Sequence, residues 1–291
     1  MKNIVRYLLC GLAMGAADVV PGVSGGTIAF ITGIYQQLLD GIQAFDMTFF
    51  KLFFRGRFRE ALSRIPWSFL LPLAIGIACS IFSLAKLVLY LLHAYPVVVW
   101  SFFFGLIVAS IVMLLRELKQ YGPGVWTAFA AGAAFAWWLT GAESVHMTQN
   151  PPMLFLAGFI AICAMLLPGI SGAFVLVLLG QYQFVLTAVT TFNLPVLVLF
   201  ALGCVCGLLL FARVLNYCLR RYRTATLAIL IGIMAGSLRT VWPWQEANMP
   251  ALPPSLGVEI ALAALCCAAG VCLPLLLDAL PALLKTKAIV R

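Results

Sequence analysis

The sequence predicts an all-α polytopic membrane protein with an inverted-topology repeat, each half a re-entrant helical hairpin followed by three transmembrane helices. Three observations lead to this fold class. Of the 291 residues, 64% are hydrophobic and only 9% are charged, which is more apolar surface than one water-soluble core can bury. A Pro-Gly-x-Ser-Gly motif occurs twice inside apolar segments. Lysine and arginine gather in some of the connections and are absent from others, as expected for loops on two sides of a membrane.

Long segments that are almost free of charge provide the candidate transmembrane helices. Most of them reach the roughly 20 residues that span a bilayer. Examples are residues 67–92, 96–115, 195–219, 224–238 and 255–277. The net charge of +9 is dispersed between them, so it indicates membrane loops and not a nucleic-acid-binding surface. The nine cysteines lie in apolar runs without disulfide or zinc-site spacing, and we expect neither a metal nor a cofactor.

The N-terminus allows two interpretations. Lys2 and Arg6 precede the apolar residues 7–13, which is the pattern of a cleaved signal peptide. A matching apolar run precedes the second copy of the motif. We therefore favour the first arm of a hairpin, with a signal peptide as the alternative.

Two blocks of sequence recur at fixed offsets. The first recurs 147 residues later, so that Pro21, Gly22, Ser24, Gly25 and Tyr35 match Pro168, Gly169, Ser171, Gly172 and Tyr182. The second recurs 127 residues later, so that Gly76, Lys86 and Gly105 match Gly203, Arg213 and Gly232. Internal duplication explains both blocks. We predict a single membrane domain over residues 1–291, with one repeat at about 4–140 and the other at about 151–277.

The distribution of cations predicts which side each connection faces. Residues 45–66 hold five lysines and arginines, and further cations follow near residues 118 and 221 and in the C-terminal tail. The connections 141–151 and 244–254 hold none. The positive-inside rule then places the basic connections and both termini in the cytoplasm. Residues 3–43 begin and end inside, and residues 151–192 begin and end outside.

Each of these two segments is thus a hairpin, which either dips into the membrane or crosses it twice. Proline lacks an N–H and glycine lacks a side chain, so Pro21–Gly22 and Pro168–Gly169 should end one helix, and Ser24 or Ser171 should cap the next. Irregular backbone at membrane depth requires surrounding protein or a wet cavity. We favour re-entrant hairpins. Inverted repeats with broken helices are typical of transporters that bind substrate where the breaks meet.

A helix that starts inside the membrane directs unpaired N–H groups at an anion. The first break offers glycines and hydroxyls, and the second keeps a shorter set, so the predicted binding residues are Ser24, Gly25, Gly26, Thr27, Ser171 and Gly172. The alternative is that the glycines only allow close helix packing.

Two matching cations, Lys86 and Arg213, lie within apolar helices, where a charge costs roughly 2.5–3.5 kcal/mol on insertion scales. They either bind an anion or snorkel to the membrane surface. Asp18, which Met165 replaces in the second copy, would pair with a cation, take up a proton or cap a helix. Arg239 is a weaker candidate near the outer end of its segment. Residues 49–64 predict a basic amphipathic helix on the cytoplasmic surface.

The stretch 15–27 around Asp18, Pro21 and Ser24, together with residues 167–172, resembles the bacterial polyprenyl-phosphate translocase family, PopT-like, over nearly the whole chain. The resemblance implies a multi-pass transporter of the bacterial plasma membrane. Its cargo would be the lipid undecaprenyl phosphate, returned from the outer to the inner leaflet for reuse in peptidoglycan and related polymers. The phosphate would suit the residues at the breaks, and the prenyl tail would stay in the bilayer.

The sequence is compatible with two alternatives to lipid transport. A transporter of small anions would use the same half-helices. An enzyme acting on a lipid phosphate would need a reactive histidine or clustered carboxylates, whereas the sequence has two histidines and nine scattered acids, so we expect no enzyme. A homo-oligomer is compatible with the sequence.

Overall fold

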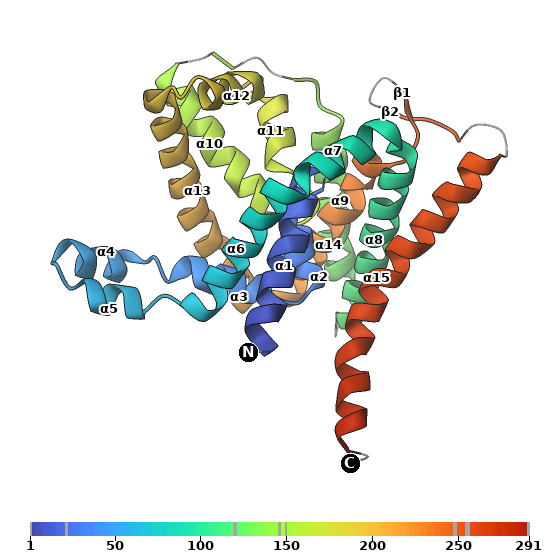
Figure 1. Cartoon of the computed structure of the whole chain (residues 1–291), viewed down its shortest axis with the longest axis horizontal. Coiled ribbons are helices and arrows are strands. Elements are labelled where there is room, and N and C mark those ends of the chain that lie inside the picture. The colour runs from blue at the N-terminus through green and yellow to red at the C-terminus, as the bar shows by residue number, and fades with distance from the viewer. Residues whose placement is uncertain are drawn as a thin grey trace.

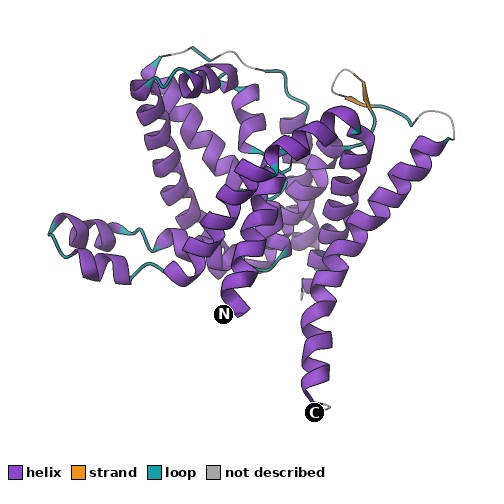
Figure 2. Cartoon of the chain, viewed as in Figure 1, coloured by secondary structure: helices purple, strands orange, loops and turns teal. Residues whose placement is uncertain are grey.

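The computed structural model describes residues 2–20, 23–118, 121–144, 147–148, 150–246, 249–253 and 257–289. It is built almost wholly of helices (Figure 2). Four helices are long and apolar enough to cross a membrane, or up to six if each of two bent helix pairs forms one span. The prediction of an all-α polytopic membrane protein is confirmed.

The first half of the chain contains nine helices within its described residues. They are α1 (Lys2–Val19), α2 (Gly25–Ile31), α3 (Tyr35–Gln43), α4 (Met47–Phe54), α5 (Phe58–Ser63), α6 (Trp67–Ser83), α7 (Ala85–Ala94), α8 (Pro96–Glu117) and α9 (Pro123–Thr140). The first break lies between α1 and α2. Its Pro21 and Gly22 fall outside the described residues.

The second half repeats this order without the two short helices α4 and α5. Its elements are α10 (Pro151–Leu166), α11 (Gly172–Leu178), α12 (Tyr182–Thr190), α13 (Leu194–Arg221), α14 (Arg223–Ser237), the 3-10 turn η1 (Leu238–Val241), the short antiparallel strands β1 (Gln245–Glu246) and β2 (Met249–Pro250), and α15 (Val258–Ile289). As predicted, Pro168 and Gly169 separate two helices, since α10 ends at Leu166 and α11 begins at Gly172.

The helix bounds repeat at the two offsets found in the sequence. Helices α11 and α12 begin 147 residues after α2 and α3, because 172 minus 25 and 182 minus 35 both give 147. Helix α13 covers the combined length of α6 and α7 at an offset of 127, because 194 minus 67 and 221 minus 94 both give 127. The two halves therefore share one succession of elements.

One predicted span is not continuous. The segment 67–92 breaks near Leu84 into α6 and α7, which are bent by 47°, whereas its counterpart α13 is unbroken. The hydroxyl of Ser83 donates to the carbonyl of Cys79, and such side-chain bonding within a helix favours bending. The residue at the matching position of α13 is Leu210, which offers no such bond.

Glycines bring matching helix pairs into backbone contact. Helix α1 packs on α6 through Gly11 and Gly76, and α10 packs on α13 through Gly158 and Gly203. A Cβ atom at Gly158 would lie 2.5 Å from the carbonyl oxygen of Phe200. Small residues permit this close approach between membrane helices.

The last helix of each half packs on the other half. Helix α8 packs on α15, where Gly105 and Gly270 meet the opposing backbone, and α14 packs on α9 through Gly232 and Gly132. We call these contacts the exchanged helix pairs. They join the two halves into one body.

The two hairpins enter the molecule from opposite edges. In Figure 1, α1 starts at the lower edge and α3 returns there, whereas α10 descends from the upper edge and α12 returns to it. The breaks meet between them, since α2 contacts α10. The end of α15 lies at the same edge as the start of α1 (Figure 1).

Helices α4 and α5 form an arm that projects sideways from the lower edge (Figure 1). The arm has a small core of its own, made by Phe49, Ala61 and Ile65. The sequence predicted one helix over residues 49–64. The structure has two, because Gly56 takes a positive φ of 75° that ends α4, a conformation that favours glycine.

Candidate functional site

Hydrogen bonds join the two helix breaks to each other. The hydroxyl of Ser24 donates to the carbonyl of Met165 over 3.1 Å, and the hydroxyl of Thr27 accepts from the backbone N–H of Gly169 over 2.8 Å. The hydroxyl of Tyr35 donates to the carbonyl of Leu166 over 2.7 Å. Both Ser24 and Thr27 are fully buried. We call this set of contacts the break junction.

The first break is capped by the protein itself. The hydroxyl of Ser24 accepts from the N–H of Gly26 over 3.1 Å, which confirms its predicted capping role. The carboxylate of Asp18 accepts from the N–H of Gly25 over 2.6 Å. Of the three roles considered for Asp18, the structure shows helix capping. The positive end of α2 thus already faces a carboxylate, which favours it electrostatically.

The second break is built differently. Ser171 precedes α11 and is buried, but its side chain makes no capping hydrogen bond, so the predicted capping role is wrong for this residue. Gly169 has a positive φ of 92°, and a Cβ atom there would lie 2.9 Å from Cα of Met234. A Cβ atom at Gly172 would lie 2.9 Å from the carbonyl oxygen of Ala161. The second break is therefore held by packing against α14 and α10.

Neither of the two predicted cations takes part in the hydrogen bonds of the break junction. Lys86 follows the break between α6 and α7, and Arg213 lies within α13, and both side chains are exposed. Within the described ranges, neither side chain makes a hydrogen bond or an ion pair. Each is thus a charge on an apolar helix with no protein partner among those residues.

Arg239 has a local partner. Its guanidinium donates to the carbonyl of Trp137 over 3.2 Å and lies 4.7 Å from the centre of the Trp137 ring. A cation that meets the last carbonyls of a helix stabilises that helix end. Arg239 therefore links η1 to the end of α9 through the hydrogen bond and the ring contact.

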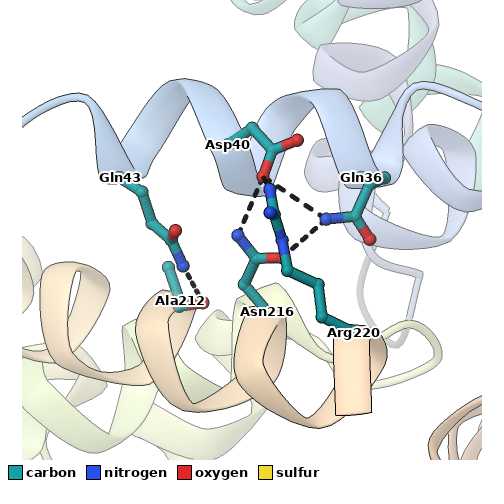
Figure 3. Close-up of polar contacts among 6 residues, drawn as sticks. All are labelled: Gln36, Asp40, Gln43, Ala212, Asn216 and Arg220. Carbon is teal, nitrogen blue, oxygen red and sulfur yellow. Dashed lines mark hydrogen bonds and ion pairs between the residues drawn. The ribbon is translucent and has the colours of Figure 1, made fainter. Parts of the chain in front are cut away.

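A polar network at the lower edge was not predicted from the sequence. Asp40 accepts hydrogen bonds from Arg220 and Asn216, each over 2.8 Å, and joins α3 to α13 (Figure 3). Burial alone would raise the pKa of Asp40, but the hydrogen bonds from Arg220 and Asn216 outweigh it and hold that pKa below its usual value. The signal that could have revealed this network is Asn216, a buried amide in an apolar helix.

The chain is similar to proteins of one known family. Residues 14–253 match the family described as undecaprenyl phosphate translocase-like. The chain belongs to this family. A relative from Vibrio cholerae serotype O1, named polyprenyl-phosphate transporter, is 48% identical over 244 residues, which is 84% of this chain and 79% of the relative. A Staphylococcus aureus relative of the same name is 33% identical, covering 83% of this chain and 87% of its own. No solved structure matches the chain.

The range shared with the translocase-like family includes every residue of the break junction and of the polar network, and it ends before α15. Both relatives carry the name of a transporter. With its apolar helices, the chain is thus a multi-pass membrane protein of a transporter family. Within the residues that the structure describes, no three His, Cys, Asp or Glu side chains gather as a metal site.

Proposed function

We propose that this chain is a flippase that returns undecaprenyl phosphate from the outer to the inner leaflet of the bacterial plasma membrane. There the lipid carrier is reused for peptidoglycan and other envelope polymers. The names of the two relatives support a polyprenyl phosphate as cargo. The geometric observation that carries the proposal is Arg213, a cation within a helix of 28 residues that is apolar enough to span the membrane.

An unpaired cation in such a helix requires compensation, since a charge at the bilayer centre costs roughly 2.5–3.5 kcal/mol on insertion scales. A phosphate group supplies it by charge-assisted hydrogen bonds. Lys86 occupies the matching position in the first half, because 213 minus 86 gives the repeat offset of 127. These two cations bind the phosphate headgroup during its passage, while the prenyl tail remains in lipid.

Separation of the two helix breaks at the break junction is the proposed conformational change of the transport cycle. In the described conformation Ser24 and Thr27 bind the second break, Asp18 binds the N–H of Gly25, and Ser171 is buried. The proposed ligands, which are Ser24, Gly25, Gly26, Thr27, Ser171 and Gly172, would therefore meet the phosphate only when the two breaks separate. The phosphate then replaces the carboxylate of Asp18 at the start of α2. Protonation of Asp18 would weaken its hold on the N–H of Gly25, and this is the proposed route for proton coupling.

The proposed orientation places the lower edge of Figure 1 in the cytoplasm, with both termini and the arm. The two halves are then inverted across the membrane as one transporter domain. The support is the charge of the arm, which carries Lys51, Arg55, Arg57, Arg59 and Arg64 against Asp46 and Glu60, as the positive-inside rule requires.

Single-cysteine labelling should confirm this orientation. A cysteine at Phe58, in the exposed arm, should react with an impermeant thiol reagent only from the cytoplasmic side, and a cysteine at Met147 only from outside. Both would be introduced after the nine native cysteines are replaced. Reaction of both reporters from the same side would refute the inverted orientation.

Transport by purified protein tests the function itself. Proteoliposomes that contain the chain should move undecaprenyl phosphate between leaflets faster than empty liposomes. Arg213→Ala should slow this movement about tenfold or more, because a hydrogen bond to a charged group contributes about 1.5–3 kcal/mol. Arg59→Ala, which removes a cation from the exposed arm, should leave the rate unchanged.

The same assay separates the alternatives. Long-chain prenyl phosphate should compete with the labelled lipid, whereas chloride or inorganic phosphate in excess should have no effect. Competition by simple anions would identify a small-anion transporter. Release of inorganic phosphate from the lipid would identify an enzyme.

A further inference from the structure

The two ends of the molecule differ in how a hairpin meets the opposite half. At the lower edge, α3 of the first hairpin packs on α13 of the second half. The matching elements at the upper edge are α12 and the α6–α7 pair. In the part of the chain that the structure describes, α12 has no comparable packing with α6 or α7. The described conformation is thus closed by a hairpin at one end only.

A network of side chains makes the closed contact (Figure 3). One carboxylate oxygen of Asp40 accepts from Arg220 Nη2 and from Asn216 Nδ2, each over 2.8 Å. The amide oxygen of Asn216 accepts from Gln36 Nε2 over 2.6 Å and from Arg220 Nε over 3.1 Å. Asn216 is 1% exposed. Because a buried amide needs its partners, Asn216 favours the docked position of α3.

The neighbouring turn adds a further bond between the same two helices. Gln43 Nε2 donates to the carbonyl oxygen of Ala212 over 3.1 Å. Ala212 directly precedes Arg213, the cation assigned to the phosphate. The position of α3 is therefore coupled to the segment of α13 that carries this cation.

The ion pair of the closed contact contributes little to its stability. The side chains of Arg220 and Asp40 remain 68% and 42% exposed, and exposed ion pairs contribute only about 0.2–1 kcal/mol. A cavity of about 300 Å³ lies beside them, lined by Gln36, Asp40, Leu219, Arg220 and Arg223. Because the pair is exposed beside this cavity, water can replace its hydrogen bonds when the helices separate.

The residues of the ion pair are not repeated at the matching positions of the sequence. At the repeat offsets, Asp40 corresponds to Thr187 and Arg220 corresponds to His93, because 187 minus 40 gives 147 and 220 minus 93 gives 127. Gln36 corresponds to Gln183, and Asn216 corresponds to Leu89. The charged contact thus did not come from the duplicated pattern.

We propose that Asp40, Asn216 and Arg220 form a latch that closes the cytoplasmic end of the transport path. The latch opens when the protein adopts its inward-facing state. The proposal rests on the proposed function and orientation. In transporters with inverted repeats, two related halves exchange their end contacts between states. Opening of the latch would accompany docking of α12 onto the α6–α7 pair at the other edge.

Reversible cross-linking tests whether the latch must open. Cysteines at Gln36 and Asn216, in a chain without native cysteines, would be joined by a short bis-methanethiosulfonate linker. Transport should fall about tenfold or more when the linker closes and should return with dithiothreitol. A matched control joins cysteines at Asp46 and Arg64, a pair within the arm at 3.2 Å, and should transport at the same rate in both states. Full transport with the Gln36–Asn216 linker closed would overturn the proposal.

A labelling experiment supports the test if the cross-linked variant is inactive before treatment. A reporter cysteine at Ser171 would be labelled from each membrane side in the Asp40→Asn and Asp46→Asn variants. Asp40→Asn should raise the ratio of cytoplasmic to external labelling about threefold to fivefold, as expected when an ion pair of up to about 1 kcal/mol is lost. Asp46→Asn should leave the ratio unchanged. An unchanged ratio in Asp40→Asn, or an equal rise from both sides, would indicate a merely structural contact.

The two proposals can fail separately. If the wild-type protein moves no polyprenyl phosphate, the proposed function is wrong, and the labelling ratio still reports on the latch. If the wild type transports and the closed linker does not slow it, the latch alone is wrong.

Discussion

Gly203→Leu is expected to prevent stable assembly of α10 with α13. A Cβ atom at Gly203 would collide with the carbonyl oxygen of Phe155, and one turn later a Cβ atom at Gly207 would lie 2.6 Å from the carbonyl oxygen of Phe159. The obstacle in both places is backbone, which cannot rotate away as a side chain does. Overpacking of a tight contact costs about 1–3 kcal/mol and occasionally more. A leucine at this crossing should force the helices apart.

The measurement is thermal unfolding in detergent, followed by fluorescence-detected size-exclusion chromatography. Gly203→Leu should lower the melting temperature strongly or abolish the monodisperse peak. Gly124→Leu is the matched control, because a Cβ atom at Gly124, in the first turn of α9, would meet nothing within 4 Å. Equal melting temperatures for the two variants would show that α10 and α13 do not cross at Gly203.

Gly169→Ala is expected to abolish most transport. Gly169 combines a positive φ of 92° with close neighbours, since a Cβ atom there would lie 2.7 Å from Ser237 Oγ and 2.9 Å from Met234 Cα. Its N–H also donates to Thr27 in the break junction. Alanine would therefore displace the second break from α14 and disturb its bond to the first break.

Gly33→Ala isolates the cost of the backbone conformation alone. Gly33 has a positive φ of 71°, but a Cβ atom there would meet nothing within 4 Å. A left-handed conformation costs a non-glycine residue roughly 1–2 kcal/mol. Gly33→Ala should be mildly destabilised and keep most of its transport rate in proteoliposomes. Similar transport by Gly169→Ala and Gly33→Ala would mean that the contact with α14 is unimportant.

The order of the main helices and the position of the two breaks could be predicted from the sequence, whereas the division of residues 49–64 and of residues 67–92 into two helices each could not. Repeated prolines, glycines and serines marked the breaks, and the offsets of 147 and 127 reappear as helix bounds. Backbone features of this kind depend on local chemistry, because proline and glycine restrict or free the chain wherever they occur. The meeting of the two breaks followed from the same pattern.

The direction in which each side chain points was less predictable. Lys86 and Arg213 lie on exposed helix faces, and Asp18 turns back to the N–H of Gly25. The rotation of a helix about its axis depends on its packing partners, and an apolar helix in lipid has a weak amphipathic pattern to predict it. The network of Asp40, Asn216 and Arg220 was not predicted, because these residue types are not repeated at the matching positions of the other half.

The exchanged helix pairs also govern how the chain can be made. Gly105 of α8 packs against the backbone of Cys267 of α15. The ribosome adds Cys267 162 residues after Gly105, since 267 minus 105 is 162. At about 5–20 residues per second, this delay is on the order of 10–30 s. During that interval the glycine face of α8 has only lipid or the insertion machinery to cover it. A gene cut between the repeats would therefore yield two fragments, one with α9 but without its partner α14, and one with α15 but without its partner α8. Co-expression of both fragments would be needed to recover the protein.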